Sequence, residues 1–383
     1  MRSRLALLLA VAAAALLAAP AAMPSRFLQL GIFDDTQVNY GNPDVVFPML
    51  KQLRTQVVRV NLVWGGPNGV ARRRPVNPMN PNDPAYNWSV YDRTVSYATA
   101  NGMKVVFSIL GTPPWANSAA GVNVVPKQIL DLERFAAAAA RRYSGTWKAP
   151  DGRTLPAVRQ WLAWNEPNNP AFLRPQYRKV SGRLVIQSAI DYAKICNAIV
   201  KGVRKTTVGA SKVACGVTGP RGNNNPNSAR PALAPVPFLR AMKKAGAKGF
   251  DAYAHHPYYG APRETPSTPP PLGIRGNAPT AVTLGNINVL IKEVTRLYGN
   301  KRIWITEYGY QTNPPDRAFG VSFANQARYL TQAYGIAKRH PRIDMLLWFL
   351  LRDERRVDGW QSGLLTASGA KKPAFAAFQK LRG

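Results

Sequence analysis

Eight short apolar runs alternate along this chain with longer segments of helical periodicity. The runs are rich in Val, Ile and aromatic residues and cover 27–33, 57–64, 104–110, 160–164, 212–217, 250–254, 302–306 and 343–350. The helical segments cover 43–53, 88–100, 127–143, 188–203, 237–245, 282–298, 323–338 and 373–381. Strands separated by helices form right-handed βαβ units with a parallel sheet. Eight such units predict an α/β chain that closes into a (β/α)8 TIM barrel.

The alternative architecture is an open, doubly wound sheet, but no glycine-rich dinucleotide-binding motif follows the first run. Because we also find no linker, we expect residues 23–383 to form a single domain. Irregular insertions rich in Pro, Asn or Gly cover 65–87, 146–155, 219–235 and 260–280. The first, third and fourth of these follow strands two, five and six, which places them on the face where barrel enzymes build their active sites.

Two glutamates stand at the ends of predicted strands. Glu166, in WLAWNEPNNP, follows the fourth run, and Glu307, in IWITEYGY, follows the seventh. On a closed barrel these strand ends face each other across the mouth. Glycoside hydrolysis uses two such carboxylates, of which one protonates the leaving oxygen and the other attacks the sugar or activates water. Either glutamate alone would be a solvated strand-end residue, but the pair favours a catalytic role.

The neighbours of the two glutamates predict different protonation states. Trp161, Trp164 and a proline should withhold water from Glu166, which raises its pKa and suits a proton donor. A nucleophilic Glu307 must stay ionised, and Tyr258 or Arg59 could supply the hydrogen bonds or charge that this requires.

Two short motifs suggest a family. The sequences Trp164-Asn165-Glu166-Pro167-Asn168 and Thr306-Glu307-Tyr308-Gly309 resemble the acid/base and nucleophile motifs of the clan A glycoside hydrolases. The form WNEPN is most similar to family 39, and the family 5 endoglycanases are next. The resemblance implies a retaining barrel enzyme with Glu166 as acid/base on strand four and Glu307 as nucleophile on strand seven.

The same resemblance implies roles for further residues. Asn165 would donate to the 2-hydroxyl of the sugar, and Trp348 on strand eight would form a floor under the sugar ring. His256 and Tyr258, in HHPYYG, resemble the clan's His-x-Tyr near the nucleophile, and Arg59 stands near the place of a basic residue that supports the nucleophile in family 5. Arg59 could equally cross-link layers inside the barrel. Adjacent His255 and His256 must point to opposite faces of a strand, so one of them should be a packed residue.

The sequence departs from family 5 after the third strand, where GTPPWAN offers Trp115 and no histidine. Aromatic residues in loops or at strand ends are candidates to stack on sugar rings, although any one of them is more often a core residue. The candidates are Trp64, Trp115, Tyr259, Tyr310 and Trp360.

The N-terminus resembles a secretory signal peptide. Met1 to Arg4 is basic, residues 5–19 are apolar, and small residues follow, so we expect cleavage near Ala21 or Ala22 and an extracellular protein. An uncleaved membrane anchor is the alternative, but the apolar run is short for a bilayer span. No later stretch is long and apolar enough to cross a membrane.

The chain is strongly basic, with 51 Lys plus Arg against 19 Asp plus Glu and a formal charge of +32. Such a field attracts polyanions, so acidic polysaccharides join the candidate substrates, although the charge could also be spread over a solvated surface. We find no basic helix with interleaved aromatic residues, which is the pattern that would indicate a specific nucleic-acid partner. Two other functions stay open: a catalytically inactive barrel that binds carbohydrate or cell wall, and a basic polyanion-binding protein.

The remaining expectations concern cofactors, thiols and assembly. Cys196 and Cys215 could form a disulfide or remain two buried thiols, since sequence does not give their separation. The sequence contains neither a CxxC spacing nor a His/Cys cluster, so we do not expect a structural zinc site. We expect no metal or organic cofactor, and we expect a monomer.

Overall fold

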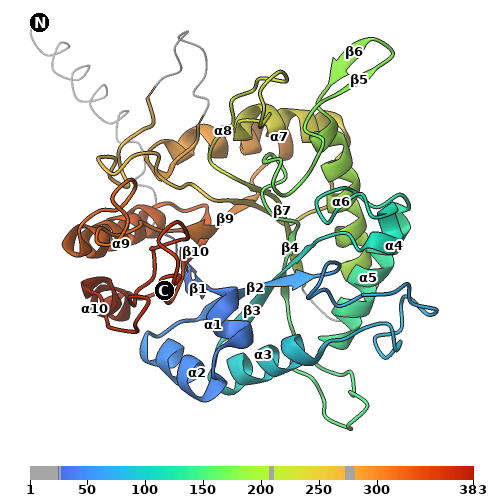
Figure 1. The fold of residues 1–383 in the computed structure, drawn as a ribbon, viewed down its shortest axis with the longest axis horizontal. Coiled ribbons are helices and arrows are strands. Elements are labelled where there is room, and N and C mark those ends of the chain that lie inside the picture. Colours follow the sequence, from blue (N-terminus) through green and yellow to red (C-terminus); the bar gives the residue numbers. More distant parts are fainter. Residues whose placement is uncertain (1–24, 26, 207–210, 272–280) are drawn as a thin grey trace, which may run out of the picture.

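The computed structural model describes residues 25, 27–206, 211–271 and 281–383 (Figure 1). The expected signal peptide, residues 1–22, lies outside the described residues, and so does the end of the insertion at 260–280. Within the described part of the chain, no helix is long and apolar enough to cross a bilayer.

Eight parallel strands close into a barrel, with the order β1-β10-β9-β8-β7-β4-β3-β2 around it. The strands are β1 (Gln29–Phe33), β2 (Val57–Val63), β3 (Lys104–Leu110), β4 (Gln160–Ala163), β7 (Lys212–Thr218), β8 (Ala252–His255), β9 (Arg302–Tyr308) and β10 (Ile343–Phe349). Each corresponds to one of the apolar runs in the sequence. The predicted TIM barrel is therefore confirmed.

Helices form a ring outside the barrel (Figure 1). The eight predicted helical segments correspond to α2 (Pro43–Gln52), α3 (Ser89–Ala100), α5 (Ile129–Arg142), α6 (Gln187–Arg204), α7 (Pro235–Lys244), α8 (Ile287–Tyr298), α9 (Phe323–Arg339) and α10 (Pro373–Lys380). Additional short elements were not predicted. They are α1 (Asp35–Tyr40), α4 (Pro114–Asn117) and a hairpin of β5 (Arg178–Val180) and β6 (Arg183–Val185). The predicted segment 282–298 includes the 3-10 turn Leu284–Asn286 ahead of α8.

Side chains of alternate strand residues fill the barrel, as the period of two in a strand requires. The buried interior cluster consists of Val57, Val106, Leu162, Ala214, Val217, Ala252, Ala254, Trp304, Met345 and Leu347. The intervening strand residues point outward and join the larger core between the sheet and the helices. Inward positions near the carboxyl ends of the strands are therefore the ones that reach the mouth.

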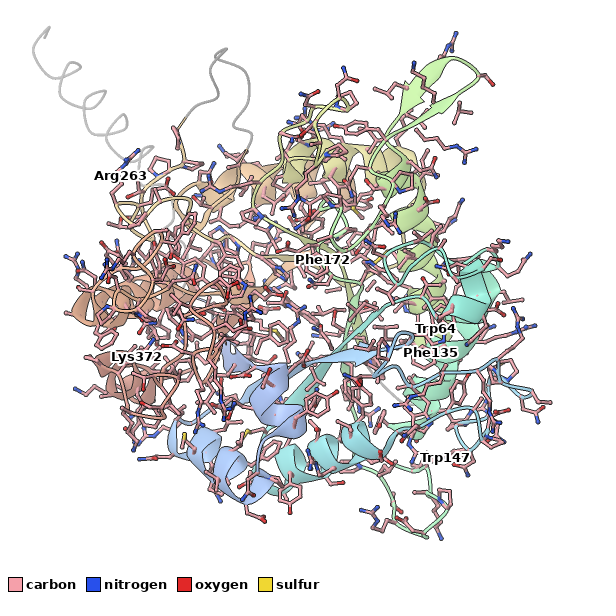
Figure 2. The ribbon with its side chains drawn as sticks, in the orientation of Figure 1. Trp64, Phe135, Trp147, Phe172, Arg263 and Lys372 are labelled. Carbon is pink, nitrogen blue, oxygen red and sulfur yellow. A yellow bond between two sulfur atoms is a disulfide. The ribbon has the colours of Figure 1, made fainter. Side chains whose placement is uncertain are left out.

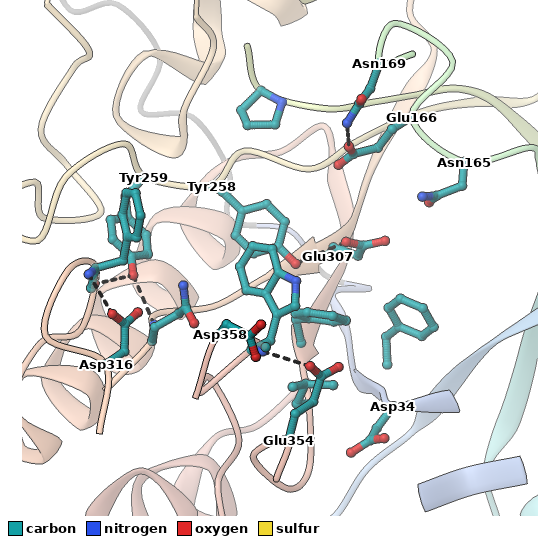
Figure 3. A pocket seen from close by; sticks show the side chains of 18 of the residues that line it. Asp34, Asn165, Glu166, Asn169, Tyr258, Tyr259, Glu307, Asp316, Glu354 and Asp358 are labelled. Carbon is teal, nitrogen blue, oxygen red and sulfur yellow. Dashed lines mark hydrogen bonds between the residues drawn. The ribbon is translucent and has the colours of Figure 1, made fainter. Parts of the chain in front are cut away.

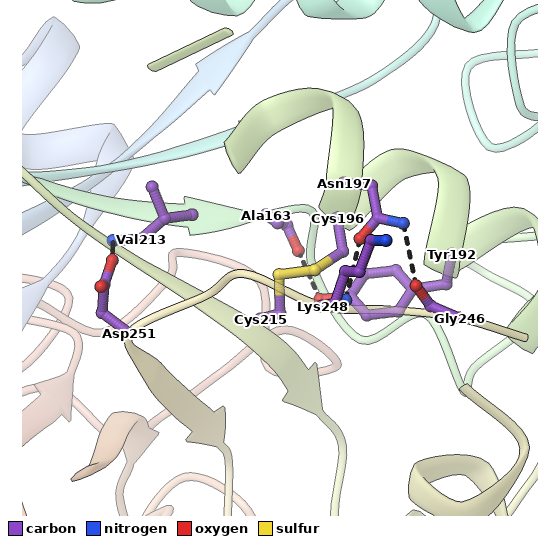
Figure 4. Close-up of a disulfide and its surroundings, with 9 residues drawn as sticks. All are labelled: Ala163, Tyr192, Cys196, Asn197, Val213, Cys215, Gly246, Lys248 and Asp251. Atoms are coloured by element: carbon purple, nitrogen blue, oxygen red, sulfur yellow. Dashed lines mark hydrogen bonds between the residues drawn. A yellow bond between two sulfur atoms is a disulfide. The ribbon is translucent and has the colours of Figure 1, made fainter. Parts of the chain in front are cut away.

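A disulfide joins Cys196 of α6 to Cys215 of β7, with 5.9 Å between the two Cα atoms (Figure 4). Both residues are fully buried. Of the two possibilities that the sequence left open, the structure has the disulfide, and it fastens a helix of the outer ring to the barrel wall.

Candidate active site

A cavity of about 1030 Å³ opens at the carboxyl ends of the strands, and both Glu166 and Glu307 line it (Figure 3). Asn165, Tyr258, Phe349 and other residues from the strand ends and their following loops complete its wall. The cavity lies where the barrel topology predicted a site.

Glu166 is carried by a sharply turned segment after β4. The backbone of Trp164 and of Glu166 has positive φ, at +70° and +35°, a conformation that side-chain-bearing residues rarely adopt. The Glu166 amide donates to the carbonyl of Val217 on neighbouring β7 at 2.8 Å, and the Asn168 side chain accepts from the Gly219 amide at 2.8 Å. These bonds fix the turn against the next strand, so the carboxylate is held in one position over the mouth.

A β-bulge brings Glu307 into the cavity. Ile305 and Tyr308 of β9 pair with Leu346 and Trp348 of β10, so β9 has one residue more than its partner over this stretch. Strict alternation would point only one of Thr306 and Glu307 inward. Because of the extra residue, Thr306 contacts the buried polar groups of the barrel while Glu307 lines the cavity.

Arg59 of β2 organises the polar groups beneath the cavity. Its side chain is fully buried, and its Nη1 donates to Glu307 Oε1 at 2.7 Å and to the Thr306 carbonyl at 3.1 Å. Its Nη2 donates to Asn165 Oδ1 at 2.6 Å. Since the Oδ1 of Asn165 is occupied, the amide NH2 of this residue is the group free to donate into the cavity.

Tyr258 completes the hydrogen bonding of Glu307, because its hydroxyl donates to Oε2 at 3.1 Å. One oxygen of Glu307 thus accepts from a guanidinium and the other from a phenol. These two donors hold the carboxylate in place at the cavity wall. Both residues that the sequence offered as partners of Glu307, Tyr258 and Arg59, contact it in the structure.

His256 links the two glutamates. Its Nδ1 lies 3.0 Å from Glu166 Oε1 and 3.5 Å from Glu307 Oε1, and its Nε2 lies 3.1 Å from Arg59 Nη1. A guanidinium can only donate, so Nε2 accepts and the ring proton of the neutral histidine is on Nδ1. Burial lowers the pKa of His256 to about 3, which keeps it neutral. His255 is instead a packed residue that contacts Thr218 and the Val282 carbonyl, as expected for one of the pair.

Burial raises the pKa of Glu166, while a hydrogen bond from Asn169 and the charge of Arg59 act in the opposite direction. Its side chain is 13% exposed. The predicted shift and its predicted cause, desolvation, are both present. The two tryptophans do not line the cavity, because Trp161 packs outside the barrel against Phe107 and Trp164 donates to the Phe172 carbonyl.

Gly219 is one of the residues that bury the Glu166 carboxyl group. A Cβ at this position would lie 2.9 Å from Glu166 Cδ, closer than real Cβ contacts allow. The absence of a side chain at Gly219 thus gives the Glu166 carboxylate its room.

The two carboxylates are close together. One oxygen of Glu166, one of Glu307 and a ring nitrogen of His256 all lie within 4.8 Å of one another. These three side chains could in principle ligate a metal, but the guanidinium of Arg59 already supplies a positive charge to Glu307. A separation of about 5 Å suits direct attack by one carboxylate, whereas about 6.5–9.5 Å would leave space for a water molecule.

Three of the aromatic residues predicted to bind sugar lie away from the cavity. Trp348 is buried outside the barrel, where its Nε1 donates to the Ser362 carbonyl at 2.8 Å. Trp64 packs against Phe135 of α5, as Figure 2 shows, and Trp115 packs edge-on against Trp64. None of these three tryptophans lines the cavity.

The aromatic wall of the cavity consists of other residues. Phe349, one position after Trp348, points inward and lies 5.3 Å from the ring of Trp360. Tyr258 and Phe33 join them on the wall. Tyr259 and Trp360 from the sequence candidates line the cavity, whereas Tyr310 is buried behind Tyr259 with their ring centroids 4.0 Å apart.

The sequence analysis missed several cavity residues. Asp34 and Asp35 directly follow β1 and could have been found by the same strand-end rule that identified the glutamates. Phe349 could have been found by alternation from the inward Met345 and Leu347. Asn169 and Asp316 lie in irregular loops, where no periodicity marks the residues that reach the cavity.

Solved structures with a similar barrel include several carbohydrate-active enzymes. One is a family 39 glycoside hydrolase from Bacteroides cellulosilyticus WH2, with 18% identity, a TM-score of 0.59, and coverage of 92% of this chain and 63% of that one. Another is a glucosidase from Croceicoccus marinus, with 15% identity, a TM-score of 0.63, and coverage of 94% and 67%. A third is a fungal β-1,4-galactanase, with 14% identity, a TM-score of 0.57, and coverage of 93% and 100%.

This chain shares their barrel fold. It spans less than two thirds of the first of these structures. No protein-family model matches the chain, and no curated protein matches it in sequence.

Proposed function

We propose that this chain is a retaining glycoside hydrolase that cleaves a poly- or oligosaccharide by double displacement. The observation that carries the proposal is the pair of carboxylates at the barrel mouth, whose nearest oxygens lie within 4.8 Å. Support also comes from the barrel fold, which the glycoside hydrolases named above share at low identity. The N-terminal segment, with its basic start and apolar run, supports export as part of the proposal.

In the first step Glu307, ionised between Arg59 and Tyr258, attacks the anomeric carbon as Glu166 gives its proton to the leaving oxygen. The glycosidic C–O bond breaks and a covalent ester to Glu307 forms. In the second step Glu166, now ionised, takes a proton from water, which displaces Glu307 and releases the sugar. The amide NH2 of Asn165 donates to a hydroxyl of the bound sugar throughout.

Replacing each glutamate separates the two roles. Glu307→Gln should abolish turnover of every aryl glycoside, because no nucleophile remains. Glu166→Ala should retain its first step on glycosides with good leaving groups, which need little protonation. Added azide should then accelerate this variant and give a glycosyl azide with the anomeric configuration of the starting glycoside.

The measurement is release of the aryl group by each purified variant from a panel of dinitrophenyl and nitrophenyl glycosides. Asp151→Asn, which changes an exposed loop residue, is the control for handling and folding. Full activity in either glutamate variant would refute the assignment. Carbohydrate binding by a wild-type protein that turns over no glycoside would favour the inactive binding barrel instead.

A further inference from the structure

Acidic side chains are concentrated at the cavity, although the chain as a whole is basic. The chain has 51 basic and 19 acidic residues. Seven acidic residues line the cavity, whereas Arg221 is the only Lys or Arg among the described residues that line it. The acidic residues are Asp34, Asp35, Glu166, Glu307, Asp316, Glu354 and Asp358. A chain with so few carboxylates has gathered a large share of them around one cavity.

The two glutamates of the proposed reaction account for only part of this charge. Asp34 and Asp35 follow β1, Asp316 lies in the loop after β9, and Glu354 and Asp358 lie in the loop after β10. Since β1, β10 and β9 are neighbours in the barrel, these five acidic side chains lie along one continuous side of the mouth. Burial raises the pKa of Asp34 to about 6 and that of Asp35 to about 7, so the negative charge of this side at neutral pH comes mainly from the other three. We call this side the acidic wall, and Figure 3 labels four of its residues.

Some carboxylates of the acidic wall also have local structural roles. Asp34 accepts from the backbone amides of Gln37, Leu351 and Arg352, so it holds two loops together. Asp358 pairs with the exposed Arg356. Local bonding therefore explains part of the wall, but Asp316 differs from these residues.

Asp316 retains an unpartnered oxygen. The residue is 7% exposed, and the amides of Ala318 and Phe319 both donate to its Oδ1, at 2.8 and 3.0 Å. Its Oδ2 has no hydrogen-bond partner among the described residues, although the residue lines the cavity. This oxygen is not among the enclosed, unpartnered side-chain atoms of the described residues, so it is open to the cavity and a cation there can reach it. A ligand in the cavity would supply that partner.

We propose that the cavity binds a cationic glycan, a chain that contains amino sugars with free ammonium groups, in preference to an acidic polysaccharide. The inference rests on the proposed function, since it names the substrate class of the same cavity. Ammonium groups of the glycan contact the acidic wall, with one of them at Asp316. At the reaction centre the amide NH2 of Asn165 needs an acceptor, so a hydroxyl is bound there and the charged groups belong to neighbouring sugars.

The net charge alone predicts the opposite preference. A field of +32 attracts polyanions to the outside of the molecule. Inside the cavity, however, an anionic chain would place its carboxylates against those of the acidic wall at short range, where repulsion is screened little. Local charge decides what binds in a cavity of this size.

The test compares oligosaccharides that differ only in charge. Glu307→Gln is used so that binding is measured without turnover, at low and at high salt. The probes are β-1,4-linked oligomers of equal length in which glucose alternates with glucosamine, glucose or glucuronic acid, and the same three charge types on a galacto-configured backbone. We expect a cationic oligomer to bind most tightly and its anionic counterpart least tightly, with the difference shrinking as salt rises. Tightest binding of an anionic oligomer, or no binding of either cationic oligomer, would overturn the proposal.

A second variant tests the acidic wall itself. Asp316→Asn keeps the acceptor for both backbone amides and removes the charge, so in the same background it should weaken binding of the cationic oligomer by about threefold or more. Binding of the neutral oligomer should not change. Asp151→Asn removes the same charge from an exposed loop and should leave both affinities unchanged. The proposal would be overturned if Asp316→Asn and Asp151→Asn changed the affinity for the cationic oligomer by the same amount.

The outcomes also separate this proposal from the proposed function. Hydrolysis by the wild-type chain together with a preference for anionic oligomers would refute only the substrate class. Tight binding of cationic oligomers by a chain that turns over no glycoside would refute only the hydrolase function.

Discussion

At the scale of single residues, one buried arginine fixes the states of the groups around it. Arg59 contacts Glu307, Asn165 and His256, so it holds a carboxylate in place, orients an amide and selects a histidine tautomer. A lysine could not make these contacts together, because it lacks the planar fork of donors. The sequence suggested Arg59 either as a support for the nucleophile or as a cross-link between layers of the barrel.

Asn169 offers a test of the protonation of Glu166. Its Nδ2 donates to Glu166 Oε2 at 3.2 Å, which lowers the pKa of a carboxyl group that burial raises. A proton donor is active below its pKa and loses activity as pH rises through it. Asn169→Ala removes the bond that stabilises the ionised form, so the alkaline limb of the pH profile should move to higher pH.

The measurement is kcat/KM against pH for a glycoside with a poor leaving group, which depends on protonation. Asn288→Ala, on the outer face of α8, is the matched control and should leave the profile in place. An alkaline limb that stays fixed, or moves to lower pH, in Asn169→Ala would show that this bond does not set the pKa of Glu166.

At this scale, some positions of single side chains could be predicted from the sequence and others could not. Glu166 and Glu307 were predictable because a strand-end rule and two motifs agreed. Trp348 was placed wrongly because adjacent strand residues point to opposite faces, so an error of one position exchanges the cavity for the core. Glu307 reaches the cavity through a bulge in β9, and nothing in the local sequence marks that extra residue.

At the scale of elements, long periodic segments were predictable and short ones were not. The strands of the barrel are nearly continuous apolar runs because both of their faces are buried. The β5–β6 hairpin has exposed, charged residues, and α1 has only six residues, of which just Val38 and Asn39 are buried. Such elements bury too little apolar surface to leave a pattern in the sequence.

The disulfide between α6 and β7 leads to a prediction about stability. It closes a loop with a sequence separation of 19 residues. Constraining the unfolded chain over that length contributes about 3 kcal/mol to the free energy of unfolding. Replacing Cys196 and Cys215 together by Ala should therefore lower that free energy by about 3 kcal/mol and leave kcat/KM unchanged, since neither residue lines the cavity.

Chemical denaturation of the double variant and the wild type, with and without reductant, measures this effect. The reduced wild type should resemble the double variant. Equal stability of the oxidised wild type and the double variant would contradict the loop-closure explanation, and a loss of activity at full stability would show that the disulfide positions the site.

At the scale of the whole molecule, the net charge and the distribution of the charged residues carry different information. The formal charge of +32 suggested an affinity for polyanions, but the total cannot show that acidic residues gather around the cavity. That gathering depends on which loops follow neighbouring strands, and it becomes visible only when the barrel order is known. The fold could be predicted from the sequence, whereas the charge of the cavity required the structure.

The central claim is that Glu166 and Glu307 act on opposite sides of one glycosidic bond at a separation too short for a water molecule between them. The most direct test is the anomeric configuration of the first sugar released, followed by proton NMR during hydrolysis of an aryl glycoside and before mutarotation. A double displacement predicts that the product first appears with the configuration of the substrate. First appearance of the opposite anomer would require a single displacement by water and would contradict the account.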